Sequence, residues 1–96
     1  MTAREVLDEL RTLMPELAAR YHVRGLGLFG SFARGEAKGS SDIDLIVEFE
    51  EGADLLDLVG LSLYLEEKLG RVVDVVPKSA VREELSREIF GETLSV

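Results

Sequence analysis

A stretch of seven residues, Ile43 to Phe49, already limits the folds open to this chain, because its apolar residues alternate along the sequence. Side chains on a β-strand point to opposite faces in turn. One face would therefore hold Ile43, Leu45, Val47 and Phe49. The other would hold Asp44, Ile46 and Glu48, with Asp42 on the same side just before the strand. The pattern predicts a strand that packs on one face and presents carboxylates on the other.

A helix and a strand are predicted ahead of this stretch. Thr2 and Glu5 match a capping box, and apolar residues then recur every three or four positions as far as Tyr21. Pro15 lies inside this pattern, so we expect the helix to be kinked there or to restart. The branched, glycine-containing segment Val23 to Phe29 is typical of a strand that another backbone or a ligand approaches closely.

The rest of the chain predicts further elements of both kinds. Ser31 to Arg34 fits one helical turn followed by a loop, and Asp54 to Leu69 fits a helix ended by a glycine. Apolar residues cover more than one stripe of that longer helix, so one side is expected to be free for a partner. The valine-rich segment Arg71 to Pro77 predicts a third strand. A last helix would be capped by Ser79 and ended by Gly91, with the final residues frayed.

These elements follow one another as αβ(α)βαβα, which predicts a single-domain α/β structure over residues 1–96. The net charge of -8 argues against direct nucleic-acid binding, since phosphates would be repelled. No apolar run approaches the roughly 18 residues of a membrane span, and neither cysteines nor a signal sequence point outside the cell. We therefore expect a cytoplasmic protein without a membrane partner.

Carboxylates at three positions suggest a metal site. Asp42 and Asp44 would project from one strand face a few ångströms apart, where both stay ionised comfortably only beside a cation. Asp74 lies among four valines, so we expect it to be buried and, if its strand lies beside the second, to complete the cluster. Hard oxygen ligands select Mg²⁺ or Mn²⁺, which in paired sites promote in-line displacement at a phosphate. Alternatively, the first two mark a solvated strand entry and the third an exposed strand edge.

Gly30 and Ser31 follow a predicted strand and open a helical turn. Backbone N–H groups there can point at an anion, and the Ser31 hydroxyl adds a donor. Arg34 and Lys38 are close in sequence and could offset the charge of a triphosphate, although both could equally be solvated. A lone Gly-Ser pair is usually just a turn. This one is distinguished by its spacing, because ten residues separate it from Asp42.

The chain resembles the minimal nucleotidyltransferase family of the polymerase-beta-like superfamily. The resemblance rests on the segments Leu28 to Ala37, Ser41 to Val47 and Val73 to Val76. It implies a polymerase-beta-like nucleotidyltransferase fold, an α+β arrangement in which helices pack against a small mixed sheet of three to four strands. The first two strands would be antiparallel, and the second and third would be parallel.

The resemblance also implies roles for individual residues. Two Mg²⁺ ions, or Mn²⁺ in their place, would be bound by the catalytic residues Asp42, Asp44 and Asp74. Asp74 would in addition help to activate the acceptor hydroxyl. Gly30 and Ser31 would hold the nucleotide phosphates, and Arg34 and Ser41 are further candidates for nucleotide binding. ATP is the expected nucleotide, although no motif here distinguishes it from GTP, CTP or UTP.

Proteins of this family often accompany a HEPN-domain toxin as its antitoxin, and some transfer AMP from ATP to a tyrosine of the toxin. We therefore expect a Mg²⁺-dependent enzyme that transfers AMP to a hydroxyl of a partner protein. Two alternatives stay open. One is a catalytically idle antitoxin that blocks its partner sterically. The other is transfer to a small-molecule acceptor, which the short chain disfavours because no second domain closes a pocket.

Overall fold

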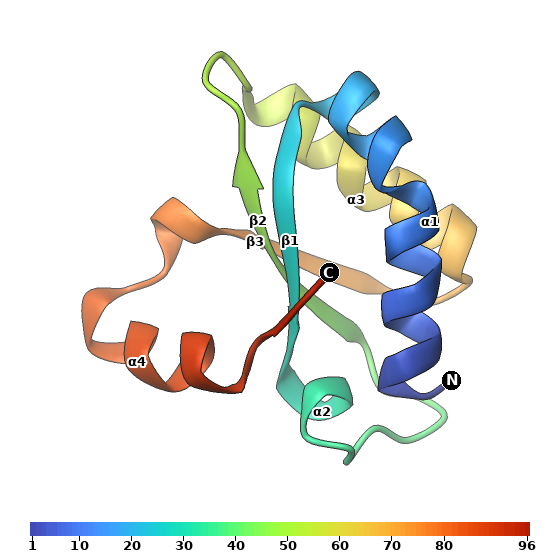
Figure 1. Ribbon diagram of the computed structural model, residues 1–96. Coiled ribbons are helices and arrows are strands. Elements are labelled where there is room, and N and C mark those ends of the chain that lie inside the picture. The colour runs from blue at the N-terminus through green and yellow to red at the C-terminus, as the bar shows by residue number, and fades with distance from the viewer.

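The computed structural model describes all residues from 1 to 96 and contains one four-stranded mixed sheet with helices on both sides (Figure 1). The strands are ordered β3-β2-β1-β4 across the sheet and comprise β1 (Val23–Phe29), β2 (Ile43–Phe49), β3 (Val73–Pro77) and β4 (Leu94–Ser95). The helices are α1 (Ala3–Tyr21), α2 (Gly30–Ala33), α3 (Leu55–Leu69) and α4 (Glu83–Glu92), with a short 3₁₀ turn, η1, at Lys78–Ala80. The predicted α/β class and mixed sheet are confirmed.

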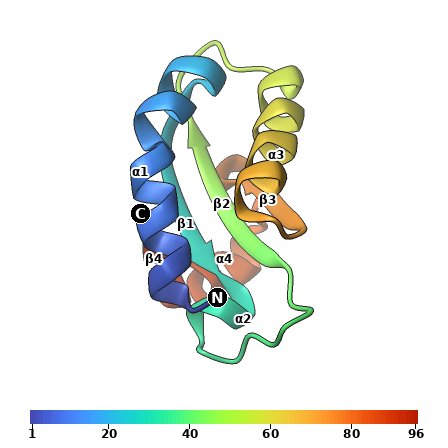
Figure 2. The same cartoon turned by 90° about the vertical axis from the view of Figure 1, so that its right-hand side faces the viewer.

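The alternation along β2 has the predicted effect on packing. Leu45 and Val47 are almost completely buried between the sheet and helices α1 and α3, which lie side by side on one face (Figure 2). Leu10 and Leu17 of α1 and Leu65 of α3 close the same core. Helix α4 lies on the other face and contributes no residue to this core. The sheet therefore has one tightly packed face and one sparsely covered face.

The first helix begins where the capping box predicts. The backbone N–H of Glu5 donates to the Thr2 hydroxyl at 3.2 Å, and the Thr2 N–H donates to the Glu5 carboxylate at 3.0 Å. The helix runs through Pro15 as one element instead of restarting there. His22 ends it in a left-handed conformation, and the Asp57 carboxylate of α3 accepts a 3.1 Å hydrogen bond from its Nδ1.

The topology of the three long strands agrees with the family fold. Strand β1 is antiparallel to β2, with Phe29 opposite Asp44, and β2 is parallel to β3, with Asp44 opposite Asp74. This register brings the end of β1 next to the start of β2 and places two of the acidic residues on neighbouring strands. None of the helices combines the length and the apolar character that crossing a bilayer requires.

The C-terminal quarter differs from the sequence predictions. Ser79 lies within η1 instead of capping the last helix, which begins at Glu83 without a side-chain cap. That helix continues through Gly91 to Glu92. The final residues, predicted to be frayed, form β4, which pairs antiparallel with β1. Directly after β4, the Val96 N–H donates to the Leu26 carbonyl at 3.0 Å. Such a two-residue strand carries no pattern that sequence periodicity could detect.

Candidate active site

Asp44 stands at the centre of the candidate site, on the sparsely covered face of the sheet. Because side chains alternate along β2, it points away from the core that holds its neighbours Ile43 and Leu45. Asp42 precedes the strand by one residue and is exposed, whereas Asp44 is half-buried. Asp74 is the direct cross-strand partner of Asp44 in the parallel β2–β3 pair. The fold therefore sets Asp44 and Asp74 on neighbouring strands, with Asp42 just before β2.

The electrostatics of Asp44 show how closely these charges are placed. Partial burial raises the pKa of the Asp44 carboxyl, and the negative charges of Asp74 and Asp42 raise it further. The guanidinium of Arg34 acts in the opposite direction and lowers this pKa, without outweighing the other causes. The charged form of Asp44 is thus disfavoured in the protein alone, and a bound cation would relieve the repulsion.

Asp74 is exposed, so the prediction that it is buried among valines is wrong. Strand β3 lies at the edge of the sheet, and the adjacent Val72 is itself 59% exposed. A run of valines does not bury its neighbour when no element covers that side of the strand. The exposed strand edge, weighed as the alternative, is what the structure shows, and it leaves the Asp74 carboxylate open to solvent.

Gly30 is required at its position for two reasons. Its φ of 74° lies in the left-handed region, which favours glycine. A Cβ atom built there would also collide with the carboxylate of Asp44. The turn that opens α2 can therefore approach Asp44 closely because residue 30 has no side chain. Ser31 follows directly and is half-buried.

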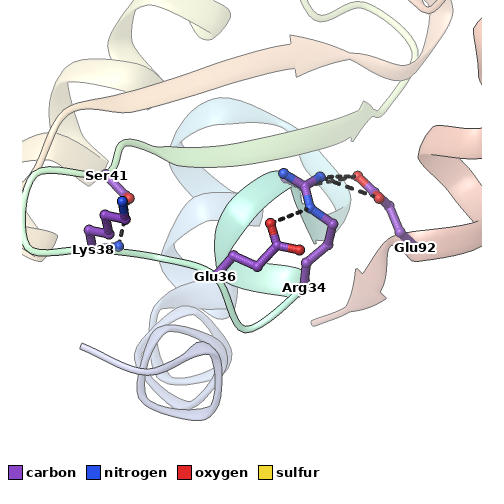
Figure 3. Close-up of polar contacts among 6 residues, drawn as sticks. Arg34, Glu36, Lys38, Ser41 and Glu92 are labelled. Atoms are coloured by element: carbon purple, nitrogen blue, oxygen red, sulfur yellow. Dashed lines mark hydrogen bonds and ion pairs between the residues drawn. The ribbon is translucent and has the colours of Figure 1, made fainter.

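Arg34 lies at the end of α2 and is paired with two glutamates (Figure 3). Its Nη1 lies 3.2 Å from Oε1 of Glu92 in α4, and its Nε lies 3.5 Å from Oε2 of Glu36. Burial lowers the pKa of Arg34, but the hydrogen bond and charge of Glu92, together with Glu36, raise it overall. The Gly30 N–H also donates to Oε1 of Glu92, at 3.3 Å. One carboxylate therefore contacts both the Gly30 amide and the Arg34 guanidinium.

Sequence reasoning missed Glu92 altogether. It lies 48 residues beyond Asp44 in a weakly patterned helix, so neither spacing nor periodicity connects it with the other site residues. Its contact with the Gly30 amide is long-range and arises because β4 turns the chain end back along β1.

The loop before Asp42 is held by Ser41 and Arg71. The Ser41 hydroxyl accepts a 2.8 Å hydrogen bond from the Lys38 N–H, which closes the turn between them (Figure 3). The Arg71 guanidinium donates to the carbonyls of Gly39 and Ser41, at 3.0 and 3.3 Å. Here Ser41 shapes the loop through its hydroxyl, which is bound to the backbone of Lys38. Arg71, at the predicted start of the third strand, gave no sequence signal for this role.

Residues 4–96 match the nucleotidyltransferase domain family. A relative named protein adenylyltransferase MntA, from Thermococcus cleftensis, is 41% identical over 96 residues, which are 100% of this chain and 97% of the relative. The chain belongs to the nucleotidyltransferase family. It is a nucleotidyltransferase of the minimal type. A further relative from Methanocaldococcus jannaschii, named as a candidate protein adenylyltransferase, is 40% identical and matches 94% of this chain and 97% of its own length.

Solved structures place the fold of this minimal nucleotidyltransferase in the same group. One, described as a candidate minimal nucleotidyltransferase, superposes with a TM-score of 0.84 at 40% identity and covers 100% of this chain and 97% of its own. Another contains a tri-AMPylated HEPN toxin of Shewanella oneidensis in complex with an MNT antitoxin. It shares the fold with a TM-score of 0.60 at 20% identity, over 97% of this chain and 66% of that one.

Enzymes of this family generally use a divalent metal, and the donor types at this site suit one. In the structure itself, no group of three or more carboxylate, histidine or cysteine side chains is arranged so that it could hold a metal ion unaided. Mg²⁺ commonly binds through one or two carboxylates together with substrate phosphates, instead of a complete protein cage. The repulsion that raises the Asp44 pKa indicates where a cation would be stabilised. The residues therefore fit a metal that arrives with a nucleotide.

A cavity of about 490 Å³ adjoins the site on the same face of the sheet. Its floor includes Gly25 and Gly27 of β1 and Ile46 of β2, and Phe90 of α4 and Lys78 line it from the other side. Ile46 is two residues beyond Asp44 on the same strand, so the cavity and the acidic cluster are neighbours along β2.

Proposed function

We propose that this minimal nucleotidyltransferase transfers AMP from ATP to a hydroxyl group of a partner protein, with Mg²⁺ bound by Asp42, Asp44 and Asp74. The observation that carries the proposal is the register that sets Asp44 opposite Asp74, with Gly30 packed against Asp44. The names of the adenylyltransferase relatives supply the nucleotide and the class of acceptor.

In the proposed reaction, the acceptor oxygen attacks the α-phosphorus of ATP. A new phosphorus–oxygen bond forms, the bond from the α-phosphorus to the bridging oxygen breaks, and pyrophosphate leaves. Asp74, exposed at the sheet edge, takes up the proton that the acceptor hydroxyl loses. When bound, Mg²⁺ would neutralise charge that develops on the phosphate oxygens and orient them for in-line attack.

The turn after β1 is the segment proposed to bind the nucleotide. The Gly30 N–H and the Ser31 hydroxyl are the donors proposed for the phosphate oxygens, and the Arg34 guanidinium offsets their charge. Gly30 can come close to the phosphates for the same reason that it comes close to Asp44, the absence of a side chain. Ser41 contributes by holding the loop that leads to Asp42.

For the acceptor we propose a HEPN-domain toxin, because the AMPylated partner in the Shewanella oneidensis complex is a HEPN toxin. This chain has a surface suited to such a partner. Leu55, Val59 and Leu63 recur every four residues on α3 and are 71%, 48% and 62% exposed, and Leu56 beside them is 78% exposed. Exposed leucines in one stripe are typical of a protein–protein contact.

The test is transfer of label from [α-³²P]ATP to the HEPN partner in the presence of Mg²⁺. Wild type should label the partner, and Asp44→Asn should lower the rate by about a thousandfold or more, since it removes a central carboxylate. Asp8→Asn, the same change on an exposed part of α1, is the matched control and should retain the wild-type rate. Equal labelling by wild type and Asp44→Asn would refute the proposal.

A second candidate function, a steric antitoxin without catalysis, is favoured by the exposed leucine stripe of α3 alone. In that case toxicity would be relieved as well by the double variant Asp42→Asn, Asp44→Asn as by wild type, whereas Leu63→Glu would fail. Under the catalytic proposal the double variant fails even though it still binds the partner. Measuring rescue and binding for both variants therefore separates the two functions.

A further inference from the structure

Glu92 occupies the position where the proposed function places a nucleotide phosphate. Its carboxylate accepts a hydrogen bond from the Gly30 N–H at 3.3 Å. It also accepts from the Arg34 Nη1 at 3.2 and 3.4 Å (Figure 3). A carboxylate and a phosphate present the same anionic oxygens to such donors. The Gly30 amide has one proton to donate, so it cannot serve Glu92 and a phosphate oxygen equally well at the same time.

The segment that delivers Glu92 is held loosely. Helix α4 has no buried residue, and its N-terminus has no side-chain cap. The helix is anchored beyond its end, where β4 pairs with β1 and Thr93 lies over Gly27, so closely that a Cβ there would collide with its methyl group. Glu92 is the last residue of α4, directly before this anchor, and no side chain of the helix belongs to the core. The Glu92 carboxylate can therefore rotate away, and the helix before it can unwind, without unfolding the core.

We propose that Glu92 is an internal competitor of the nucleotide, an autoinhibitory contact that ATP must displace before it can bind. The proposal rests on the proposed function, because it takes Gly30 and Arg34 as phosphate ligands. Displacement frees Arg34 from Glu92, removes one negative charge from beside the Gly30 amide and leaves that N–H to a phosphate oxygen. A site that already contains three aspartates would then bind ATP with less repulsion.

The direct test measures binding of AMP-PNP with Mg²⁺ by titration calorimetry to wild type, Glu92→Ala and Glu88→Ala. Glu88 is on the same helix and exposed, so its replacement removes an equal charge without touching the site. Loss of a partly exposed ion pair of about 1 kcal/mol corresponds to about fivefold in affinity. We expect Glu92→Ala to bind about three- to tenfold more tightly than wild type, and Glu88→Ala to bind within about twofold of wild type.

Unchanged or weaker binding by Glu92→Ala, when wild type binds AMP-PNP, would show that Glu92 does not compete with the nucleotide. The proposed function would stay intact. Absence of binding to wild type and to both variants would overturn the proposed function itself, and the competitor with it.

Hydrogen exchange gives an independent measurement on the wild-type chain. If AMP-PNP displaces Glu92, the amides of residues 83–92 should exchange faster with nucleotide and Mg²⁺ than without, and Glu92→Ala should exchange fast under both conditions. Slower exchange of these amides on nucleotide binding would show that α4 closes over the ligand. It would refute the proposal that the nucleotide displaces Glu92.

Discussion

The two faces of the sheet are built from the same strands but differ in what covers them. On one face, α1 and α3 enclose a core in which Leu10, Leu45 and Leu65 are completely buried. On the other, α4 buries none of its own residues and lies beside a half-buried aspartate and an open cavity. The packed face supplies stability, and the open face can therefore hold unfavourable charge and a displaceable helix. Matched substitutions on the two faces test this division.

The largest effect is expected from Leu45→Ala on the packed face. Leu45 is fully buried between the sheet and the helices, so its truncation removes apolar contacts and leaves a cavity. We expect the free energy of unfolding to fall by about 2–5 kcal/mol, measured by urea denaturation. A loss below about 1 kcal/mol would mean that this face is not the main source of stability.

Gly30→Ala should come next, and Gly35→Ala is its control. Both glycines have φ near 73°, but a Cβ at Gly35 would meet nothing within 4 Å, whereas one at Gly30 would collide with Asp44. We expect Gly35→Ala to lower the free energy of unfolding by about 1 kcal/mol, through backbone strain alone. Gly30→Ala should lower it by about 2–3 kcal/mol and also abolish labelling of the partner, since Asp44 must move. Similar losses for both variants would show that the contact with Asp44 is easily relaxed.

Leu85→Ala on α4 repeats the first substitution on the open face. Leu85 is 45% exposed, and the helix that carries it buries no residue. We expect a loss of about 0.5–1 kcal/mol in the same urea experiment, well below the loss at Leu45. If Leu85→Ala destabilised the chain as much as Leu45→Ala, α4 would belong to the core, and its proposed displacement by nucleotide would be untenable.

The sequence predicted the packed face better than the open one. The bounds of β1 and β2, the capping box at Thr2 and the end of α3 at Leu69 before a glycine are all as expected, because each depends on neighbouring residues or on a short period. The pairing of Asp42 with Asp44 could be predicted for a related reason, since the two residues are only two positions apart, at the start of β2.

The failures share a cause, which is dependence on contacts between distant segments. Asp74 is exposed because nothing covers its face of the edge strand β3, whereas Val73 on the opposite face is buried in the core. Burial on one face of an edge strand cannot be deduced from flanking valines. The end of the chain forms β4 because β1 has a free edge to pair with, and this pairing in turn brings Glu92 to Gly30. Tertiary pairing overrides weak local preference in both places.

The smallest expected effect is a gain in stability, from Asp44→Asn. Burial and the charges of Asp74 and Asp42 raise the Asp44 pKa, so the folded state disfavours the ionised carboxylate that predominates at neutral pH. A carboxyl whose pKa is raised on folding lowers stability as the pH rises above the ordinary aspartate range, and this loss disappears as the pH falls through that range. Since Asp44 is only half-buried and therefore screened, we expect Asp44→Asn to add about 0.5 kcal/mol at pH 7 without metal.

In thermal denaturation this gain corresponds to a rise in Tm of about 2–4 °C for a domain of this size. The gain should shrink toward zero as the pH falls through the ordinary aspartate range, where Asp44 becomes protonated in the unfolded chain as well as in the folded one, and Asp8→Asn should show no such gain. Mg²⁺ with AMP-PNP should raise the Tm of wild type but not of Asp44→Asn. A variant less stable than wild type at pH 7 would mean that Asp44 stabilises the fold. The open face would then supply stability as well, contrary to the difference between the two faces argued above.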